Sequence, residues 1–330
     1  MNTVGTEKMV MQSSLMRFFS RIQKYPAFGV FIAFLVIFVI FSVIAPKFLT
    51  LANLTGVFTI VSELGIITIG VTLLMISGEF NLAVSGIYVF SAFLFATLAN
   101  NIYSPLALLI TLVVASFWGY VGGIITLRMH IPSFITTLGL LMFLRGIMLA
   151  ITKGSSIDYR GDAVVPKMLA KFIGGSFRPS HFWFIALVLV FAFILTRTRY
   201  GNWVFATGGA KEVARTMGVN VDRVKLINFT ISGVLAGFSG CIVLSRFGVA
   251  NPSFGFGLEL EAIAGAVIGG TLLTGGYGTI IGAALGTFLV GMLRIGLILA
   301  GAPAYWYQAF VGAILIIAAI INLKLRRIEI

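Results

Sequence analysis

The chain has 330 residues, of which 59% are hydrophobic and 10% are charged, and its mean hydropathy is +1.08. A water-soluble domain cannot bury this much apolar surface, because its exterior must be largely polar. The composition therefore excludes a soluble globular protein. It predicts an all-α, polytopic helical bundle in a lipid bilayer, with residues 1–330 forming a single transmembrane domain.

The net charge of +13 does not indicate nucleic-acid binding, because the basic residues are scattered over the ends of apolar segments and form no continuous patch. A single cysteine, Cys241, excludes an internal disulfide. His130 and His181 stand alone, with no spacing that could assemble a metal site. We expect no nucleic acid, no metal and no cofactor.

The apolar segments predict about ten membrane spans, since a helix needs about 20 residues to cross the hydrocarbon core. The eighth is short, and glycines blur its boundary with the ninth. The predicted spans are 26–45, 56–77, 82–100, 105–127, 132–152, 181–197, 226–246, 261–274, 279–300 and 304–323. The first run is longer than the apolar region of a signal peptide, so we expect it to be retained.

The positions of Lys and Arg predict the orientation, because basic residues beside a span resist translocation. With the N-terminus in the cytoplasm, fourteen of the 23 basic residues face the cytoplasm, six face outward and three lie within spans. This asymmetry favours an N-in, C-in topology in which 1–25 is a cytoplasmic segment. The longest outer loop, 153–180, includes a possible short helix over 166–173 and is either a docking surface or a solvated connection.

The cytoplasmic loop 198–225 contains a predicted helix over 210–217. We expect Gly208 and Gly209 to break the preceding structure and Gly218 to end the helix. One face holds the apolar side chains and the other the charged ones: Ala210, Val213, Ala214 and Met217 against Lys211, Glu212 and Arg215. So short a helix needs a surface to lie on, either its own protein and the lipid headgroups or a groove on a separate cytoplasmic subunit.

The glycine-rich stretch 269–286 is not a nucleotide-binding loop. Gly275 is followed by Gly276 and Tyr277, so the phosphate-binding lysine of a Walker motif is missing. We therefore expect no ATP hydrolysis by this chain, which is not an enzyme. Gly278, Gly282 and Gly286 recur every four residues, the spacing that allows two helix backbones to pack closely in lipid.

Six charged residues in or near the predicted spans are candidates for burial, and each costs about 2.5–3.5 kcal/mol at a helix centre unless it has a partner or a wet cavity. They are Glu63, Arg145, Arg246, Glu259, Glu261 and Arg294. We expect Arg246, Glu259 and Glu261 to form a structural salt bridge among themselves or to meet a docked partner. Glu63 either lines a path for hydroxyl-rich solutes or, the favoured prediction, pairs with Arg145 or Arg294.

Four stretches occur together, in order, that are typical of one family. They are "GVTLLMISGEFNLAVSG" at 70–86, "HIPSFITTLGLLMFLRGI" at 130–147, "TRYGNWVFATGGAKEVARTMGVN" at 198–220 and "GLELEAIAGAVIGGTLLTGGYGTIIGAALG" at 257–286. Through them the chain, from about residue 48 onward, resembles the inner-membrane permease subunits of bacterial ABC importers for simple sugars, the ribose, xylose and galactose class.

The resemblance implies that residues 208–218 seat in a cleft of a cytoplasmic ATP-binding subunit, with Val213 and Met217 buried there. It further implies a substrate-binding protein that delivers the sugar and a second permease subunit, identical or related. Nucleosides, signalling sugars or branched-chain amino acids are alternative solutes. An ion-coupled secondary transporter with buried carboxylates is the alternative from another class.

The chain departs from the family pattern after the second span. Where the family commonly has Gly-x-Asp-Leu-Ser-Val-Gly-Ser, this chain has Asn81 in place of the aspartate, with Glu79 two residues earlier. If the aspartate formed an ion pair, Glu79 replaces it. If it capped a helix, Asn81 does so equally well, and we favour the cap.

Overall fold

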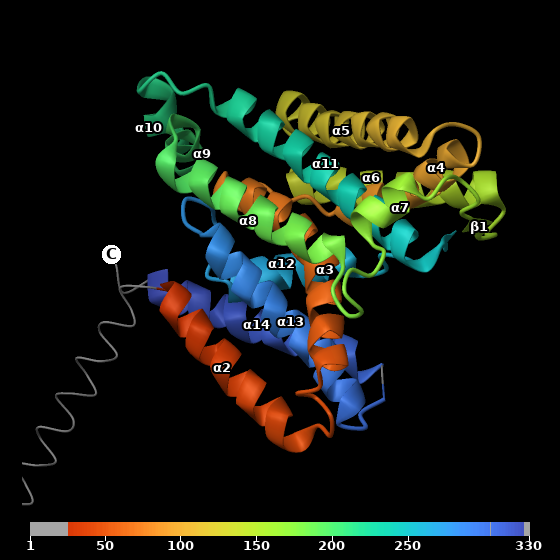
Figure 1. Cartoon of the computed structure of the whole chain (residues 1–330). Coiled ribbons are helices and arrows are strands. Elements are labelled where there is room, and N and C mark those ends of the chain that lie inside the picture. Colours follow the sequence, from red (N-terminus) through yellow and green to blue (C-terminus); the bar gives the residue numbers. More distant parts are fainter. Residues whose placement is uncertain (1–25, 304, 327–330) are drawn as a thin grey trace, which may run out of the picture.

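The structure is a computed structural model that describes residues 26–303 and 305–326, and Figure 1 shows it as a helical bundle. The predicted cytoplasmic segment 1–25 lies outside the described residues. The helices are α2 (Pro26–Ile44), α3 (Leu51–Ile76), α4 (Val84–Ala99), α5 (Ser104–Met129), α6 (Ser133–Thr152), α7 (Val164–Leu169), α8 (Pro179–Arg197), α9 (Arg199–Gly209), α10 (Lys211–Thr216), α11 (Val221–Phe247), α12 (Leu258–Ile268), α13 (Ile280–Leu299) and α14 (Trp306–Arg326). Two short strands, β1 (Ile157–Asp158) and β2 (Val249–Ala250), pair antiparallel.

Six of these helices are long and apolar enough to cross a membrane: α3, α5, α6, α8, α11 and α13. Shorter apolar helices over Gly29–Ile44, Val84–Ala99 and Trp306–Ile317 match three further predicted spans. The described residues thus support an all-α, multi-pass membrane protein. We call the end that carries α9 and α10 the α10 end, and the opposite end, with the strand pair, the β1 end.

The eighth predicted span, 261–274, is wrong in its bounds, because the helix begins at Leu258 and ends at Ile268. α12 has only 11 residues, about 16 Å at 1.5 Å per residue, which is half of a bilayer core. Residues 269–279 continue without helix toward α13. Gly270, Gly275 and Gly276 have φ values of +87°, +84° and +79°, which end a right-handed helix.

The centre of the bundle is formed by α3 and α11. α3 is buried along most of its length and packs against α8, α11, α12 and α13, while α11 also packs against α4 and α5. Glycines let these helices approach closely: a Cβ added to Gly119 of α5 would lie 3.1 Å from Gly233 Cα of α11. Packing of small residues, rather than a hydrophobic force between helices, therefore holds this core together.

Two of the three predicted packing glycines lie where α13 crosses α12. A Cβ at Gly282 would overlap the Gly269 carbonyl oxygen, and one at Gly286 would overlap that of Gly265. Gly278 precedes α13, and a Cβ there would lie 2.8 Å from Ile76 Cγ1 of α3. The glycines hold α13 against the broken span and the end of α3.

The long loop at the β1 end is anchored by Asp162. Its carboxylate accepts hydrogen bonds from the Ser104 hydroxyl (2.5 Å), the Ser104 N–H (2.8 Å) and the Val164 N–H (2.9 Å). The carboxylate therefore binds backbone N–H groups at the first turns of both α5 and α7. The helix α7 begins at Val164 rather than near residue 166. These hydrogen bonds lower the pKa of the Asp162 carboxyl below its ordinary value of 3.8.

A carboxyl whose pKa is depressed by folding stabilises the fold above its ordinary pKa, and this stability is lost as the pH falls through the folded value. We expect Asp162→Asn to speed pepsin cleavage of the loop at pH 5. The wild-type rate should approach that of the variant only below pH 3.8. Asp158→Asn, at an aspartate whose side chain is 67% exposed, is the control and should cleave like wild type. Equal rates for D162N and wild type at pH 5 would contradict the anchor.

Candidate functional site

The α10 end begins with a helix that the sequence did not predict. α9 ends at Gly209 and α10 begins at Lys211, so the helix before α10 does end at the predicted glycines. Gly208 also allows close approach, because a Cβ there would overlap the Ile76 carbonyl oxygen at the end of α3. At the start of α9, the Thr198 hydroxyl accepts a hydrogen bond from the Gly201 N–H at 3.3 Å.

The short helix α10 separates its apolar side chains into two groups. Ala214 is 3% exposed and packs against the protein, whereas Val213 is 61% exposed and Met217 is 79% exposed. Gly218 has φ +83° and donates its N–H to the Arg215 carbonyl, which ends the helix where the sequence predicts. The helix is held by its inner residue, and its two largest apolar side chains point outward.

The charged residues of α10 are all exposed. Arg215 lies 3.4 Å from the Glu212 carboxylate and 3.3 Å from that of Asp222, in the first turn of α11. Lys211 is the first residue of the helix. Exposed pairs of this kind contribute little to stability.

Three chain segments meet backbone to backbone beside α10, at what we call the glycine junction: Ile76, Gly78, Gly208, Gly275 and Gly276. The Gly276 N–H donates to the Ile76 carbonyl at 2.8 Å. A Cβ at Gly275 would lie 2.8 Å from Gly78 Cα and 3.1 Å from the Gly208 oxygen. The end of α3, the end of α9 and the turn before α13 are thus in direct contact.

A buried ion pair lies at the same end. Glu79, just after α3, is 2.6 Å from the Lys225 ammonium in α11, and the two side chains are 16% and 7% exposed. Sequence analysis singled out Glu79 but missed Lys225, because 146 residues separate the two and no local spacing links them. The pair ties the segment entering α4 to the start of α11.

Asn81 shapes the turn before α4. Its Oδ1 accepts the Ala83 N–H at 3.0 Å, and its Nδ2 donates to the Ser232 hydroxyl at 3.2 Å. The side chain therefore makes a short Asx-type turn and a cross-link to α11. A neutral amide can make both hydrogen bonds, whereas a carboxylate could not donate one.

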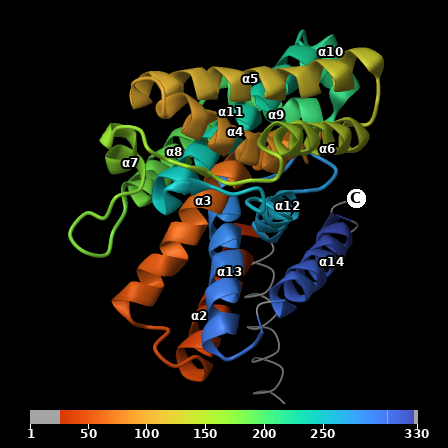
Figure 2. The same cartoon turned by 90° about the vertical axis from the view of Figure 1, so that its right-hand side faces the viewer.

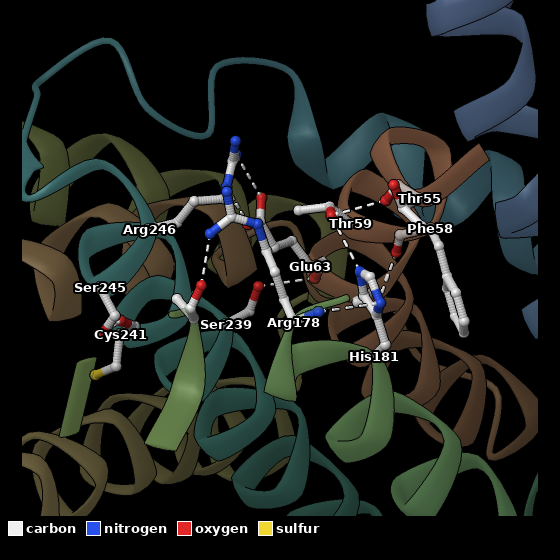
Figure 3. Close-up of polar contacts among 12 residues, drawn as sticks. Thr55, Phe58, Thr59, Glu63, Arg178, His181, Ser239, Cys241, Ser245 and Arg246 are labelled. Atoms are coloured by element: carbon white, nitrogen blue, oxygen red, sulfur yellow. Dashed lines mark hydrogen bonds and ion pairs between the residues drawn. The ribbon is translucent and has the colours of Figure 1, made fainter. Parts of the chain in front are cut away.

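A second buried ion pair lies in the middle of α3 (Figure 3). The Glu63 carboxylate accepts from Arg246 Nε at 2.5 Å and from Nη2 at 2.8 Å, and Ser239 donates to the Glu63 carbonyl at 2.7 Å. The Arg246 guanidinium also lies 3.9 Å from the centroid of the Phe247 ring. This two-point contact neutralises both charges inside the bundle.

The predicted partners of Glu63 were wrong. Neither Arg145 nor Arg294 contacts it, because Arg246 on the adjoining helix α11 occupies both carboxylate oxygens. The predicted bridge among Arg246, Glu259 and Glu261 is wrong for the same reason. Glu261 instead lies 3.8 Å from Arg294, whose guanidinium is 5.4 Å from the Tyr307 ring.

Two residues remain outside these pairs. Among the described residues, the one hydrogen bond of the Arg145 side chain goes to the Phe254 backbone oxygen, at 3.5 Å. Glu259 Oε2 is buried and makes no hydrogen bond within the described part of the chain. Sequence analysis identified both residues, and the structure brings them near one loop without joining them.

His181 takes part in a local contact set that Figure 3 also shows. Its ring stacks on Phe58 at 4.5 Å between centroids and hydrogen-bonds the Thr59 hydroxyl at 3.0 Å. Arg178, just before α8, donates to the Ala170 carbonyl at 2.5 Å. Burial lowers the pKa of Arg178 from its ordinary value. Residues 26–303 and 305–326 hold no group of three or more His, Cys, Asp or Glu side chains placed to bind a metal.

Removing one partner of a buried ion pair leaves an uncompensated charge, which costs about 3–5 kcal/mol. We therefore expect Glu63→Gln to lower the thermal unfolding midpoint in detergent strongly. The double variant with Arg246→Met should recover much of the loss, since no charge is then stranded. Glu212→Gln, at an exposed pair, is the control and should change little. A wild-type midpoint for E63Q would contradict the role of the pair.

The fold and these buried pairs define a multi-pass membrane protein. Residues 53–319 match a family described as branched-chain amino acid transport system / permease component. The chain belongs to this family of transport permeases.

Among curated relatives, the autoinducer 2 import system permease LsrC of Photorhabdus luminescens is 33% identical over 89% of each chain. The ribose import permease RbsC of Escherichia coli K12 is 32% identical over 88% of this chain and 91% of its own. The probable ABC transporter permease YphD of the same strain is 32% identical over 94% and 93%. No solved structure matches the chain.

Proposed function

We propose that this chain is the permease subunit of an ATP-driven ABC importer of the bacterial inner membrane and that it carries a simple sugar. The relatives that cover about nine tenths of it are named as permeases for ribose and autoinducer 2 import. A separate subunit would hydrolyse ATP, and a binding protein would deliver the sugar. Nucleosides and branched-chain amino acids are the alternative solutes, the latter because of the family description.

The observation that carries this proposal is the exposure of Val213 on α10 and of Met217 directly after it. An apolar side chain this exposed, on a helix too short to be stable alone, favours burial against another protein. The ATP-binding subunit is the proposed partner of the coupling loop 198–225. Gly208–Gly218 would enter its cleft, and Lys211, Glu212 and Arg215 would contact the rim.

The structure supports a ten-crossing, N-in and C-in topology. The start of α2 and the end of α14 lie on the same side of Figure 1 as α9 and α10. α12 and the irregular residues 269–279 together would form the eighth crossing. The α10 end carries several basic side chains, among them Arg197, Arg199 and Arg223, as expected of a cytoplasmic face.

We further infer how movement of α10 would reach the pathway. The glycine junction connects the end of α9 directly to α3 and to the turn before α13, and the Glu79–Lys225 pair connects α11 to the segment entering α4. Closure of two ATPases would pull on α10 and tilt these helices. No covalent step occurs in this chain.

Two ATPases require two permease subunits, identical or related, which together would enclose the path for the sugar. The opposite end, with α7 and the strand pair, is the proposed contact for the binding protein. A secondary transporter would need an available buried carboxylate for its coupling ion. Both oxygens of Glu63 are bonded to Arg246, so Glu63 is not available for that role.

We expect Val213→Asp and Met217→Asp together to abolish co-purification of the ATP-binding subunit and sugar uptake. Burying two carboxylates at a protein interface without partners would weaken the complex by well over tenfold, about 1.4 kcal/mol for each factor of ten. The measurements are pull-down of the ATP-binding subunit and sugar uptake by the assembled importer. Ile173→Asp, an exposed site at the β1 end, is the control and should keep the ATPase bound. Intact binding by V213D/M217D would remove α10 from the coupling role.

The glycine junction gives a matched pair of variants. Alanine at Gly208 would overlap the Ile76 carbonyl, whereas alanine at Gly209 would meet its nearest atom at 3.5 Å, an ordinary contact. We expect G208A to bind the ATPase and hydrolyse ATP while uptake falls by about tenfold, because overpacking of 1–3 kcal/mol displaces α9 from α3. G209A should transport normally. Equal uptake by the two variants would contradict a transmission role.

A further inference from the structure

An irregular loop reaches the middle of the bundle from the β1 end. A Cβ added to Gly255 would lie 2.8 Å from Tyr88 Cδ1, and Tyr88 is eleven residues before the end of α4, about 16 Å along that helix. Backbone without regular hydrogen bonding is not tolerated against lipid at this depth. The loop 251–257 must therefore be covered by protein or line a water-filled space.

Incompletely paired charges surround this loop. Arg145 lies seven residues from the end of α6, about 10 Å inside the bundle, and its Nε is buried without a hydrogen bond in the part of the chain described. Glu259, at the start of α12, attracts Arg145 electrostatically but does not come within 4.0 Å of it. Charges that face lipid in this state would each cost several kcal/mol, so a wet surface is the favourable alternative.

The polar groups share one side of the molecule. Figure 2 shows α12 between α6 and α14 on that side, and Arg294, 45% exposed, also lies beside α12. The outer face of α5 exposes Leu109, Val113 and Phe117. Helices α6 and α14 also expose apolar side chains, among them Met142 and Ile316, so the charged groups form a strip around α12 within an otherwise apolar side. The α5 face is suited to lipid, and the strip around α12 is suited to a narrow water-filled space.

The chemistry around Arg145 fits a neutral sugar. The Phe256 ring is 72% exposed and its centroid lies 5.5 Å from the Arg145 guanidinium carbon. A guanidinium donates hydrogen bonds to hydroxyl oxygens, and a carboxylate accepts hydrogen bonds from hydroxyl groups. An aromatic face packs against the C–H face of a sugar ring. These three groups come from α6, the loop and α12, with the Phe256 ring beside Arg145 and Glu259 attracting Arg145 electrostatically.

We propose that Arg145, Phe256 and Glu259, which we call the solute cluster, contact a neutral polyhydroxylated solute in a water-filled passage on the α6–α12–α14 side. This inference rests on the proposed function and names the site at which this chain meets its substrate. Arg145 and Glu259 bind hydroxyl groups and Phe256 covers the ring. Because the two charges offset one another, the cluster favours neutral sugars over charged ones.

Accessibility of position 256 to water tests the passage. A thiol introduced by Phe256→Cys, in the importer assembled with its ATP-binding subunit in proteoliposomes, should react with a charged, membrane-impermeant methanethiosulfonate. Excess D-ribose, D-xylose or D-galactose, whichever the wild type transports, should slow the reaction. Val113→Cys, 61% exposed on α5, is the lipid-facing control and should not react. The wild type, whose single Cys241 is buried, gives the background. No reaction at position 256 would overturn the inference.

Uptake by isosteric and conservative variants tests contact with the solute. We expect Glu259→Gln and Arg145→Lys to raise the KM for sugar by about tenfold, the effect of losing one hydrogen bond to a charged group, while ATP hydrolysis and subunit assembly persist. Unchanged KM in both variants would overturn the inference even if position 256 is wet. If the wild type transports none of the three sugars, the proposed substrate class fails, while the thiol reaction still decides whether the passage exists.

Discussion

The structure depends on one constraint, that the hydrocarbon core offers no water to satisfy polar groups. Each backbone amide and each charge within the bundle must find its partner in the chain or line a wet surface. Glu63 meets Arg246 inside the core, and Glu79 meets Lys225 at the α10 end. Arg145 has a buried Nε that makes no hydrogen bond within the described residues. The same constraint therefore indicates that water reaches this side chain.

The class of fold could be predicted from the sequence because lipid imposes a length of apolar helix that leaves a clear signal. Six long helices fall on predicted spans, and Gly218 ends α10 as expected. The eighth span could not be placed in this way, because apolar content does not distinguish a full helix from a half helix followed by turns. The glycines of 269–279 signalled the break, but their positive φ values are visible only in the structure.

The ion pairs show a different limit. Sequence analysis identified six charges that need partners but not Lys225 of α11, and it did not assign the observed partners of Glu63 and Glu261. The real partners depend on which helices are neighbours, and α3 with α11 could not be recognised as the central pair from apolar periodicity. Charge identifies the residues that need a partner, whereas helix packing decides which partner each one has.

The glycine junction has a consequence for how the chain tolerates change. Side-chain contacts have alternative rotamers that absorb a displacement before passing it on, whereas main-chain atoms in van der Waals contact have none. A joint made only of backbone is therefore stiff, and evolution cannot retune it by exchanging one side chain for another of different length. If relatives differ in how far their helices move, the difference would have to arise in the helices that the junction connects.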